Sequence, residues 1–422
     1  MKKVIVRGPA LSQSGYGEHT RFILRSLRVY PDLFDVYLLN TPWGATSWLW
    51  EDNEERRWID TTLQKTIQYT NDQAGTFDIS LQVTIPNEWE KLAPINIGVT
   101  AGIETTKIAP QWVEKSLQMD KIIVVSEHAK YGFENTRYTF QQTQTGEEFE
   151  AKVTCPIDVV GYPVKEIEPA ELDLDIKDDF NFLVVGTWII RKNLENTIKW
   201  FVEEFYDQEV GLVVKTSQAK NCVRDRAFTK QRIDALLNEY RERKCSVYLL
   251  HGDMTEQEMT GLYHHPKIKA LVSIAHGEGF GLPMYEAVYN GLPVISPNWG
   301  GQCDFLHMPK KNKNGKVKKT PMFTMVSYDM KPIQGEAHWD GVLQLDSQWC
   351  YVKEWAYKKS LRGALKENGA AKSRAKKLQK YIKSEFAEEK QYEKLINAIV
   401  GDQRESEENW LSEIEDIVKE YE

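Results

Sequence analysis

The 422-residue sequence has little of three features that would restrict its function at once: clustered cysteines, long apolar runs and excess positive charge. Its five cysteines are widely scattered and include no C-x-x-C pair, so neither a disulfide framework nor a zinc site is indicated. They are Cys155, Cys222, Cys245, Cys303 and Cys350. The longest apolar stretches, such as 122–125 and 182–185, are far shorter than the roughly 20 residues needed to span a bilayer.

The N-terminus lacks the long apolar region of a secretion signal, because Met1-Lys2-Lys3 leads directly into a strand-like run at 4–6. We therefore expect a cytoplasmic protein. The net charge of −8 argues against a protein that coats nucleic acid through its overall field. Six lysines nevertheless crowd into the segment from Lys310 to Lys319, around Asn314-Gly315, and predict an exposed hairpin tip, whereas 402–422 is dominated by acids.

What the sequence does contain is two series of short β-rich apolar runs that alternate with helical patterns, as in βαβ units with a parallel sheet. The first series comprises 4–6, 36–39, 79–83, 95–99, 122–125 and 159–161, and the second comprises 180–185, 211–215, 246–250, 270–274 and 293–296. Between them, the acidic stretch 164–179 carries Pro169 and is typical of a linker. The sequence predicts an α/β protein with two doubly wound sheets.

The length also favours more than one hydrophobic core. We expect a first domain over 1–165, a second over 166–385, and C-terminal helices over 386–422 that pack back on the first domain. Beyond about Gln348 the pattern is helical, and the predicted helices cover 349–365, 370–399 and 406–421.

A glycine-rich segment, A-H-G-E-G-F-G-L-P-M-Y-E-A at 275–287, follows the run 270–274. Its glycines allow a ligand to approach the backbone closely, and Pro283 suits the first turn of a helix whose free amides can bind a diphosphate. Glu278 and Glu286 can each accept two hydrogen bonds from a sugar diol, and we expect both to face one ligand. The alternative is a glycine-rich turn whose glutamates only cap the helix.

This segment resembles the E-G-F-G-x-x-x-x-E signature of retaining glycosyltransferases of the GT-B fold, the group of bacterial glycogen synthases and phosphatidylinositol mannosyltransferases. The resemblance implies two Rossmann-like domains that face each other across a cleft. It places Glu278 beside the donor sugar as a catalytic residue and Glu286 on the ribose hydroxyls. The backbone amides that it assigns to sugar hydroxyls and phosphate are those of Gly279, Phe280, Gly281 and Leu282.

The resemblance also implies cations for the donor phosphates, after the first strand of the second domain. Lys192 matches the family's lysine and is a second candidate catalytic residue. Where the family often has an arginine after Gly186, this sequence has Thr187, so Arg191 or Lys215 would substitute. The alternative is that Arg191 and Lys215 are ordinary surface cations. The resemblance also makes Met254 a candidate donor-binding residue. It follows the run 246–250, and at this place in the family the backbone contacts the nucleotide base.

On the acceptor side, Gly15 and Gly17 enter a helix that begins near Thr20, and in the family this loop faces the donor diphosphate. A simple tight turn is the competing interpretation. Glu104 matches an E-T pair of a bacterial and viral branch and is the third candidate catalytic residue, an acid or base, although a helix N-terminal charge explains it equally well. Ser126 is expected to cap a helix.

The sequence therefore predicts retaining transfer of a hexosyl or pentosyl group from a nucleoside-diphosphate sugar, without a further cofactor. No D-x-D motif follows a strand convincingly, so we expect no metal. The acceptor hydroxyl belongs to a saccharide, a lipid or a hydroxylated DNA base, which the Lys310–Lys319 segment can contact. Four alternatives remain. Two are enzymes: a sugar-nucleotide epimerase of the same fold and, more distantly, a phosphorylase. The other two are a non-catalytic sugar-nucleotide-binding protein and a nucleic-acid-binding protein that acts through its lysines.

Overall fold

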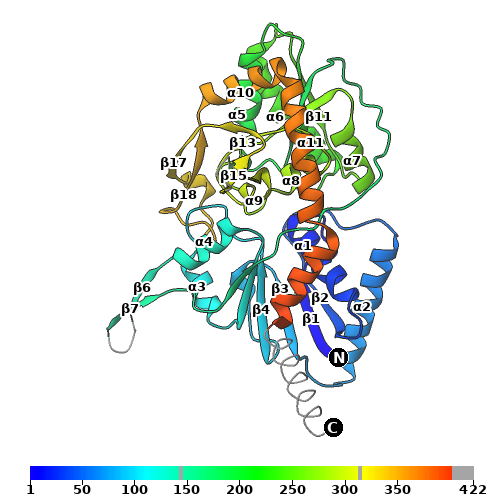
Figure 1. The fold of residues 1–422 in the computed structure, drawn as a ribbon, viewed down its shortest axis with the longest axis vertical. Helices are drawn as coiled ribbons and strands as arrows, with labels where there is room; N and C mark the ends of the chain where they lie inside the picture. Colours follow the sequence, from blue (N-terminus) through cyan, green and yellow to red (C-terminus); the bar gives the residue numbers. More distant parts are fainter. Residues whose placement is uncertain (142–145, 312–315, 402–422) are drawn as a thin grey trace.

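Two six-stranded sheets, flanked by helices, organise the chain (Figure 1). The computed structural model describes residues 1–141, 146–311 and 316–401. Neighbouring strands are parallel throughout both sheets. The first sheet runs β2 (Phe34–Asn40), β1 (Lys2–Gly8), β3 (Ile79–Val83), β4 (Ile95–Thr100), β5 (Lys121–Val124) and β8 (Ile157–Val159). The second runs β11 (Ser246–Leu250), β10 (Gly211–Lys215), β9 (Asn181–Val185), β12 (Ile268–Val272), β13 (Val294–Pro297) and β16 (Thr324–Val326). The predicted α/β class with two parallel sheets is confirmed.

Helices cover both faces of each sheet (Figure 1). Around the first sheet they are α1 (Gly15–Arg28), α2 (Glu54–Asn71), η1 (Pro86–Glu88), α3 (Pro110–Ser116) and α4 (Glu127–Asn135). In the second half they are η2 (Ile190–Lys192), α5 (Leu194–Glu204), α6 (Val223–Leu237), η3 (Asn238–Tyr240), α7 (Glu256–His264), α8 (Leu282–Tyr289), α9 (Cys303–Leu306), η4 (Gly335–Ala337), α10 (Glu354–Lys366) and α11 (Asn368–Glu385). No helix of the described residues is long and apolar enough to cross a membrane.

Three antiparallel hairpins stand apart from the two sheets. They are β6 (Tyr138–Gln141) with β7 (Glu148–Ala151), β14 (His307–Lys311) with β15 (Val317–Pro321), and β17 (Tyr328–Pro332) with β18 (Gln348–Val352). The predicted helix over 349–365 is wrong at its start, because 349–352 belong to β18 and α10 begins at Glu354. Burial explains the difference: Trp349 and Cys350 are fully buried, and Trp349 stacks on His276.

The predicted helix over 370–399 is interrupted at Phe386, where α11 ends and a further helical stretch covers 388–401. The Phe386 carbonyl accepts a hydrogen bond from the Val164 amide at 2.8 Å, so the break joins α11 to the connection between the sheets. The 388–401 stretch contacts the first half of the chain. Tyr392 stacks on Phe22, and Lys121 Nζ donates to the Ala398 carbonyl at 2.7 Å. The domain boundaries remain predictions, and the predicted helix over 406–421 lies outside the described residues.

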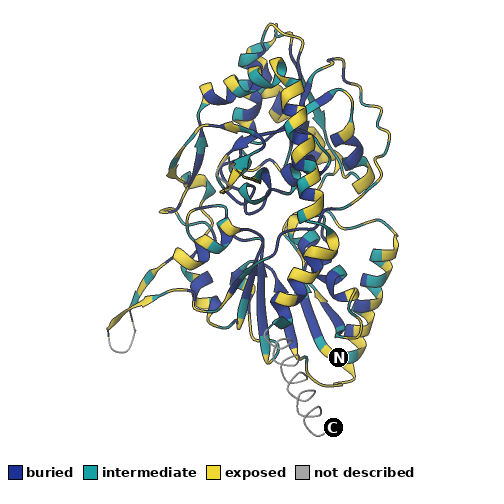
Figure 2. Cartoon of the chain, in the orientation of Figure 1, coloured by how far each residue is buried: buried dark blue, intermediate teal, exposed yellow. Residues whose placement is uncertain are grey.

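The central strands of the two six-stranded sheets are mostly buried on both faces, as expected for parallel sheets covered by helices (Figure 2). One hydrophobic cluster extends from the first sheet to α8 and the C-terminal helices. At its centre, the Phe280 ring lies 4.9 Å from Tyr162, 5.1 Å from Tyr285 and 5.0 Å from Phe305, measured between centroids. Such buried aromatic contacts fix the loop that carries Phe280 against the first half of the chain.

Candidate functional site

The candidate site lies at the carboxyl edge of the second sheet, where β9 and β12 are neighbours. The strand order reverses between these two strands, so the loops that follow them diverge and leave a crevice in which ligands of such sheets bind. The loop after β9 covers 186–193, and the loop after β12 covers 273–281. Both loops carry residues that the sequence singled out.

A cluster of ionic side chains joins these two loops to the first half of the chain. Lys192 Nζ lies 2.5 Å from Glu278 Oε1, and Arg191 Nη1 lies 3.2 Å from Glu278 Oε2. Arg191 Nη1 also donates to the Gly277 carbonyl at 2.7 Å. From the loop after β4, Glu104 Oε1 lies 3.5 Å from Arg191 Nη2. The structure therefore brings Glu278, Lys192, Arg191 and Glu104 together.

Burial makes these charges interdependent. The side chains of Glu278, Lys192 and Arg191 are only 9%, 15% and 18% exposed. Burial alone would raise the pKa of Glu278, but Lys192 and Arg191 outweigh it and hold that pKa below its ordinary value. Burial lowers the pKa of Lys192, although Glu278 opposes the change. For Arg191, the attraction of Glu104 and Glu278 exceeds the effect of burial, so its pKa is raised.

Backbone contacts hold the loop after β9 in place. Asn193 adopts a left-handed conformation with φ 55° between η2 and α5, and its side-chain amide donates to the Ile274 carbonyl at 3.2 Å. The Arg191 carbonyl accepts from the His276 amide at 2.8 Å. These bonds tie the two loops together at the ends of β9 and β12, and they aim the Arg191 and Lys192 side chains at Glu278.

The glycines of the 277–281 loop allow the two halves of the chain to touch through their backbones. A Cβ on Gly277 would lie 1.9 Å from the Glu104 carbonyl oxygen, and one on Gly279 would lie 2.3 Å from that of Ala101. No side chain fits at either position. Ser126 caps α4 as predicted, accepting from the Ala129 amide, and its hydroxyl also donates to the Gly279 carbonyl at 2.6 Å.

Two helix starts meet beside this cluster. Gly281, with φ +96°, precedes α8, whose first turn has no side-chain cap. A Cβ on Gly15, the first residue of α1, would lie 3.8 Å from Leu282 Cδ1. The Gly17 amide already donates to Ser14 Oγ at 3.0 Å, so an anion at that amide would have to displace Ser14. Phe280 has a buried side chain, which leaves its backbone as the part able to contact a ligand.

Glu286 occupies a separate, half-buried position on α8. Tyr263 donates its hydroxyl hydrogen to Glu286 Oε2 at 2.7 Å. Burial raises the pKa of Glu286 to about 7, although the Tyr263 hydrogen bond and Lys165 partly oppose the change. Lys165 Nζ in turn lies 2.8 Å from Glu18 Oε1. No direct contact joins Glu286 to Glu278 in the described chain, and the prediction that both face one ligand stays untested.

Two further predicted donor-site residues, Lys215 and Met254, follow β10 and β11, which lie on the side of β9 away from β12. Lys215 ends β10, and its amino group donates to the Gly252 carbonyl at 2.6 Å rather than to the Glu278 cluster. Burial lowers the pKa of Lys215, against the attraction of Asp253. Met254 is half-buried against the core. Arg191 is therefore the cation that accompanies Lys192, and it is not an ordinary surface residue.

Three contacts of the site were not found from the sequence. Tyr263 holds Glu286, but on α7 it is indistinguishable from a core tyrosine. His276 lies within the glycine-rich segment, and its Nδ1 lies 2.7 Å from the Cys350 carbonyl. The sequence indicated Glu104 as a site residue but not its ion pair with Arg191. Glu104 lies well before the first turn of α3, so the alternative that it is a helix N-terminal charge is wrong.

Comparison with known proteins identifies the fold. No family model and no curated protein matches the sequence. Among solved structures, sucrose-phosphate synthase from Thermosynechococcus elongatus is similar with a TM-score of 0.60 and 12% identity, over 96% of this chain and 100% of that chain. A glycosyltransferase from Rickettsia africae has a TM-score of 0.58 and 12% identity, over 95% and 98% of the two chains. The chain has the GT-B fold.

A third GT-B neighbour is HepE from Anabaena, solved in complex with UDP and glucose. It has a TM-score of 0.56 and 10% identity, over 95% of this chain and 100% of that chain. Because these similarities extend over nearly the whole chain, the GT-B fold accounts for both sheets. At such low identity the activity must be argued from the site.

The raised pKa of Glu286 predicts a pH-dependent stability. In the unfolded chain Glu286 ionises near its ordinary value of 4.5, whereas in the folded protein it stays protonated up to about pH 7. The free energy of unfolding therefore decreases as pH rises from about 4.5 to about 7, because the unfolded chain ionises Glu286 more readily than the folded protein does. Glu286→Gln removes that loss, so we expect the variant to gain stability relative to the parent by on the order of 1–3 kcal/mol between pH 5 and pH 8. Thermal unfolding of both proteins at several pH values measures it, and a constant difference would refute the assignment.

Proposed function

We propose that this GT-B protein is a glycosyltransferase that moves a hexosyl or pentosyl group from a nucleoside-diphosphate sugar to an acceptor hydroxyl. The observation that carries the proposal is the cluster of Lys192, Arg191 and Glu278 at the reversal point of the second sheet, closed by Glu104 from the other half. A leaving diphosphate develops negative charge as its bond to the anomeric carbon breaks. Two partly buried cations beside two helix starts can stabilise that charge.

The donor would enter by exchanging partners within the cluster. Glu278 now pairs with both cations, and the diphosphate would take over that role. Glu278, released from Lys192, would then accept hydrogen bonds from the sugar hydroxyls, in keeping with its place in the E-G-F-G-x-x-x-x-E segment. The amides of 279–282 would contact phosphate and sugar, and Glu286 would accept the ribose hydroxyls.

In the transfer step, the anomeric carbon loses its bond to the diphosphate oxygen and gains one to the acceptor oxygen. The acceptor hydroxyl must lose a proton, and Glu104 is our candidate to assist, because it faces the cluster from the acceptor side. We propose retention of the anomeric configuration on the strength of the signature segment. We propose that the step needs no metal, since Arg191 and Lys192 provide the positive charge. The acceptor is a saccharide, a lipid or a hydroxylated DNA base.

Release of labelled sugar from nucleotide donors, with and without candidate acceptors, tests the activity. We expect slow release without acceptor and a transferred product with the right one. Conversion of the donor to an epimer, with no transfer, would instead identify a sugar-nucleotide epimerase. Binding of donor without any turnover would leave a non-catalytic binding protein.

Replacement of Glu286 by alanine should weaken donor binding. Above about pH 7, where Glu286 is ionised, a ribose held by this half-buried carboxylate would lose a charge-assisted hydrogen bond worth about 1.5–3 kcal/mol, which is roughly a tenfold to hundredfold rise in Kd. Calorimetry with the parent, Glu286→Ala and the control Glu239→Ala, an exposed glutamate of η3, measures the change. Unchanged affinity in a folded Glu286→Ala protein would remove Glu286 from the donor site.

Replacement of Lys192 by alanine should depress turnover by on the order of 10²–10³-fold, because the cation stabilises charge that grows as the diphosphate leaves. Lys199→Ala, an exposed lysine on the following helix α5, is the matched control and should retain turnover. EDTA should have no effect on the parent. Full activity of Lys192→Ala would contradict the role of the cation, and activity lost in EDTA and restored by magnesium would contradict the metal-free step.

A further inference from the structure

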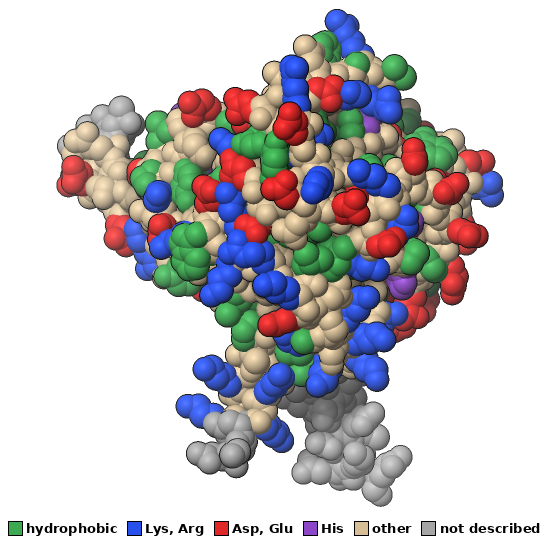
Figure 3. All heavy atoms as spheres, turned by 90° about the horizontal axis from the view of Figure 1, so that it is seen from above, with side chains coloured by type: hydrophobic (Ala, Val, Ile, Leu, Met, Phe, Trp, Pro, Cys, Tyr) green, Lys and Arg blue, Asp and Glu red, His purple; other side chains and the backbone are tan. Residues whose placement is uncertain are grey.

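A hairpin formed by β14 and β15 carries four exposed lysines, which we call the lysine ribbon: Lys310, Lys311, Lys318 and Lys319. Figure 3 shows Lys and Arg side chains gathered on this hairpin, which projects from the body of the molecule. The hairpin predicted from the sequence is thus confirmed in its two arms, whereas its tip at Asn314-Gly315 lies outside the described residues. Lys310, Lys311 and Lys318 form no ion pair with described residues.

The register of the hairpin divides the lysines between its two faces. Lys310 lies directly opposite Lys318, so both side chains leave on one face. Lys311 pairs with Val317, and Pro309 pairs with Lys319, which places Lys311 and Lys319 on the other face. Like charges placed directly opposite each other weaken a strand pair, and an isolated hairpin is only marginally stable. A partner that brings negative charge to both faces would remove this repulsion.

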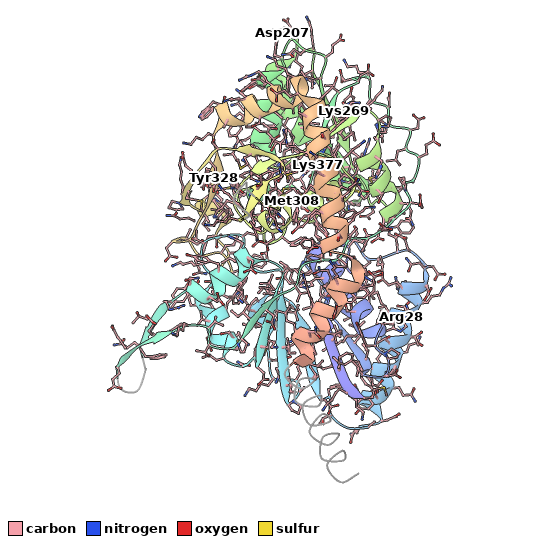
Figure 4. The ribbon with its side chains drawn as sticks, viewed as in Figure 1. Arg28, Asp207, Lys269, Met308, Tyr328 and Lys377 are labelled. Atoms are coloured by element: carbon pink, nitrogen blue, oxygen red, sulfur yellow. The ribbon has the colours of Figure 1, made fainter. Side chains whose placement is uncertain are left out.

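Helix α11 extends the positive surface beside the ribbon. Its exposed lysines are Lys372, Lys376, Lys377, Lys380 and Lys383. α11 contacts β14, and Figure 4 labels Lys377 on α11 and Met308 on β14. Met308 packs against the hydrophobic core, so the base of the hairpin is fixed to the body while its lysines project beyond it. The ribbon and α11 thus form one basic surface.

We propose that this basic surface binds duplex nucleic acid, with the lysine ribbon entering a groove. A two-stranded ribbon fits the major groove of B-DNA, whose two walls are lined with phosphates. A groove has a phosphate-lined wall on each side, so the lysines on both faces of the ribbon could each contact phosphates. A flat anionic membrane would contact the lysines of one face. Elements that bind membrane surfaces also present a broad apolar face. On the described strands β14 and β15, Val317 is the one large hydrophobic side chain that is exposed, so these strands lack such a face.

The negative net charge of the chain does not oppose this binding at physiological salt. Charges farther away than about 8 Å are largely screened from an exposed site, so the local lysines determine the potential that a phosphate meets. The contacts are to phosphates, so we expect little sequence preference. The basic surface does not include the Glu278 cluster, and binding to it needs no sugar nucleotide.

The test compares the parent with a variant in which the four lysines of the ribbon become glutamine. The matched control carries Lys2→Gln, Lys91→Gln, Lys199→Gln and Lys244→Gln, which removes the same charge from exposed positions elsewhere in the chain. Binding of a short duplex DNA is measured by fluorescence anisotropy at several salt concentrations, without sugar nucleotide. We expect parent and control to bind with a steep dependence on salt, and the ribbon variant to lose about 2 to 4 from the slope of log K against log salt.

Equal duplex binding by the parent and the ribbon variant, or none by the parent, would overturn the proposal. So would ribbon-dependent binding to phosphatidylserine vesicles at a salt concentration at which the duplex is not bound, because the partner would then be a membrane. Thermal unfolding of the ribbon variant checks that it remains folded. Sugar release by the ribbon variant is measured separately, with water as acceptor. This measurement distinguishes a failure of the nucleic-acid-binding proposal from a failure of the proposed transferase activity.

Discussion

The structure depends most on the buried ionic contact of Glu278 with Lys192 and Arg191. A charge removed from water costs several kcal/mol unless it is paired and hydrogen-bonded. Each of these three side chains therefore needs its ion-pair partner in order to be withdrawn from water here. Glu278 and Glu104 together balance the two cations and allow them to be stored in a crevice without a ligand. The same arrangement makes the cations available to a diphosphate, which carries more negative charge than the Glu278 carboxylate and more acceptor oxygens.

The rest of the interface keeps this contact in place. Gly277 and Gly279 let the loop after β12 approach the carbonyl groups of 101–104, and Ser126 bonds the same loop from α4. Phe280 is buried among aromatic side chains of both halves, which prevents the loop from withdrawing. The glycines of the signature segment thus serve close contact between backbones as well as contact with a ligand, and Glu104 reaches Arg191 because of that contact.

The sequence was informative where a feature is local. Parallel strands such as β9 and β12 are continuous apolar runs, and the glycine-rich segment with its two glutamates is contiguous, so both were predicted. Features set by distant contacts were not. Trp349 lies in a strand because β17 and His276 cover it, and α11 ends at Phe386 because Val164 bonds there. The pairing of Glu104 with Arg191 joins residues far apart in the chain, and no local pattern encodes it.

The most direct test of the central claim, that the Lys192 and Arg191 cations hold a nucleotide diphosphate, is a comparison of ligands that differ only in phosphate. Calorimetry would measure binding of the nucleoside, its monophosphate and its diphosphate in uridine, guanosine and adenosine series. The account predicts that, in at least one series, the diphosphate binds about a hundredfold more tightly than the nucleoside, since each charge-assisted contact contributes about 1.5–3 kcal/mol. Equal affinity of nucleoside and diphosphate in every series, or no binding at all, would contradict it.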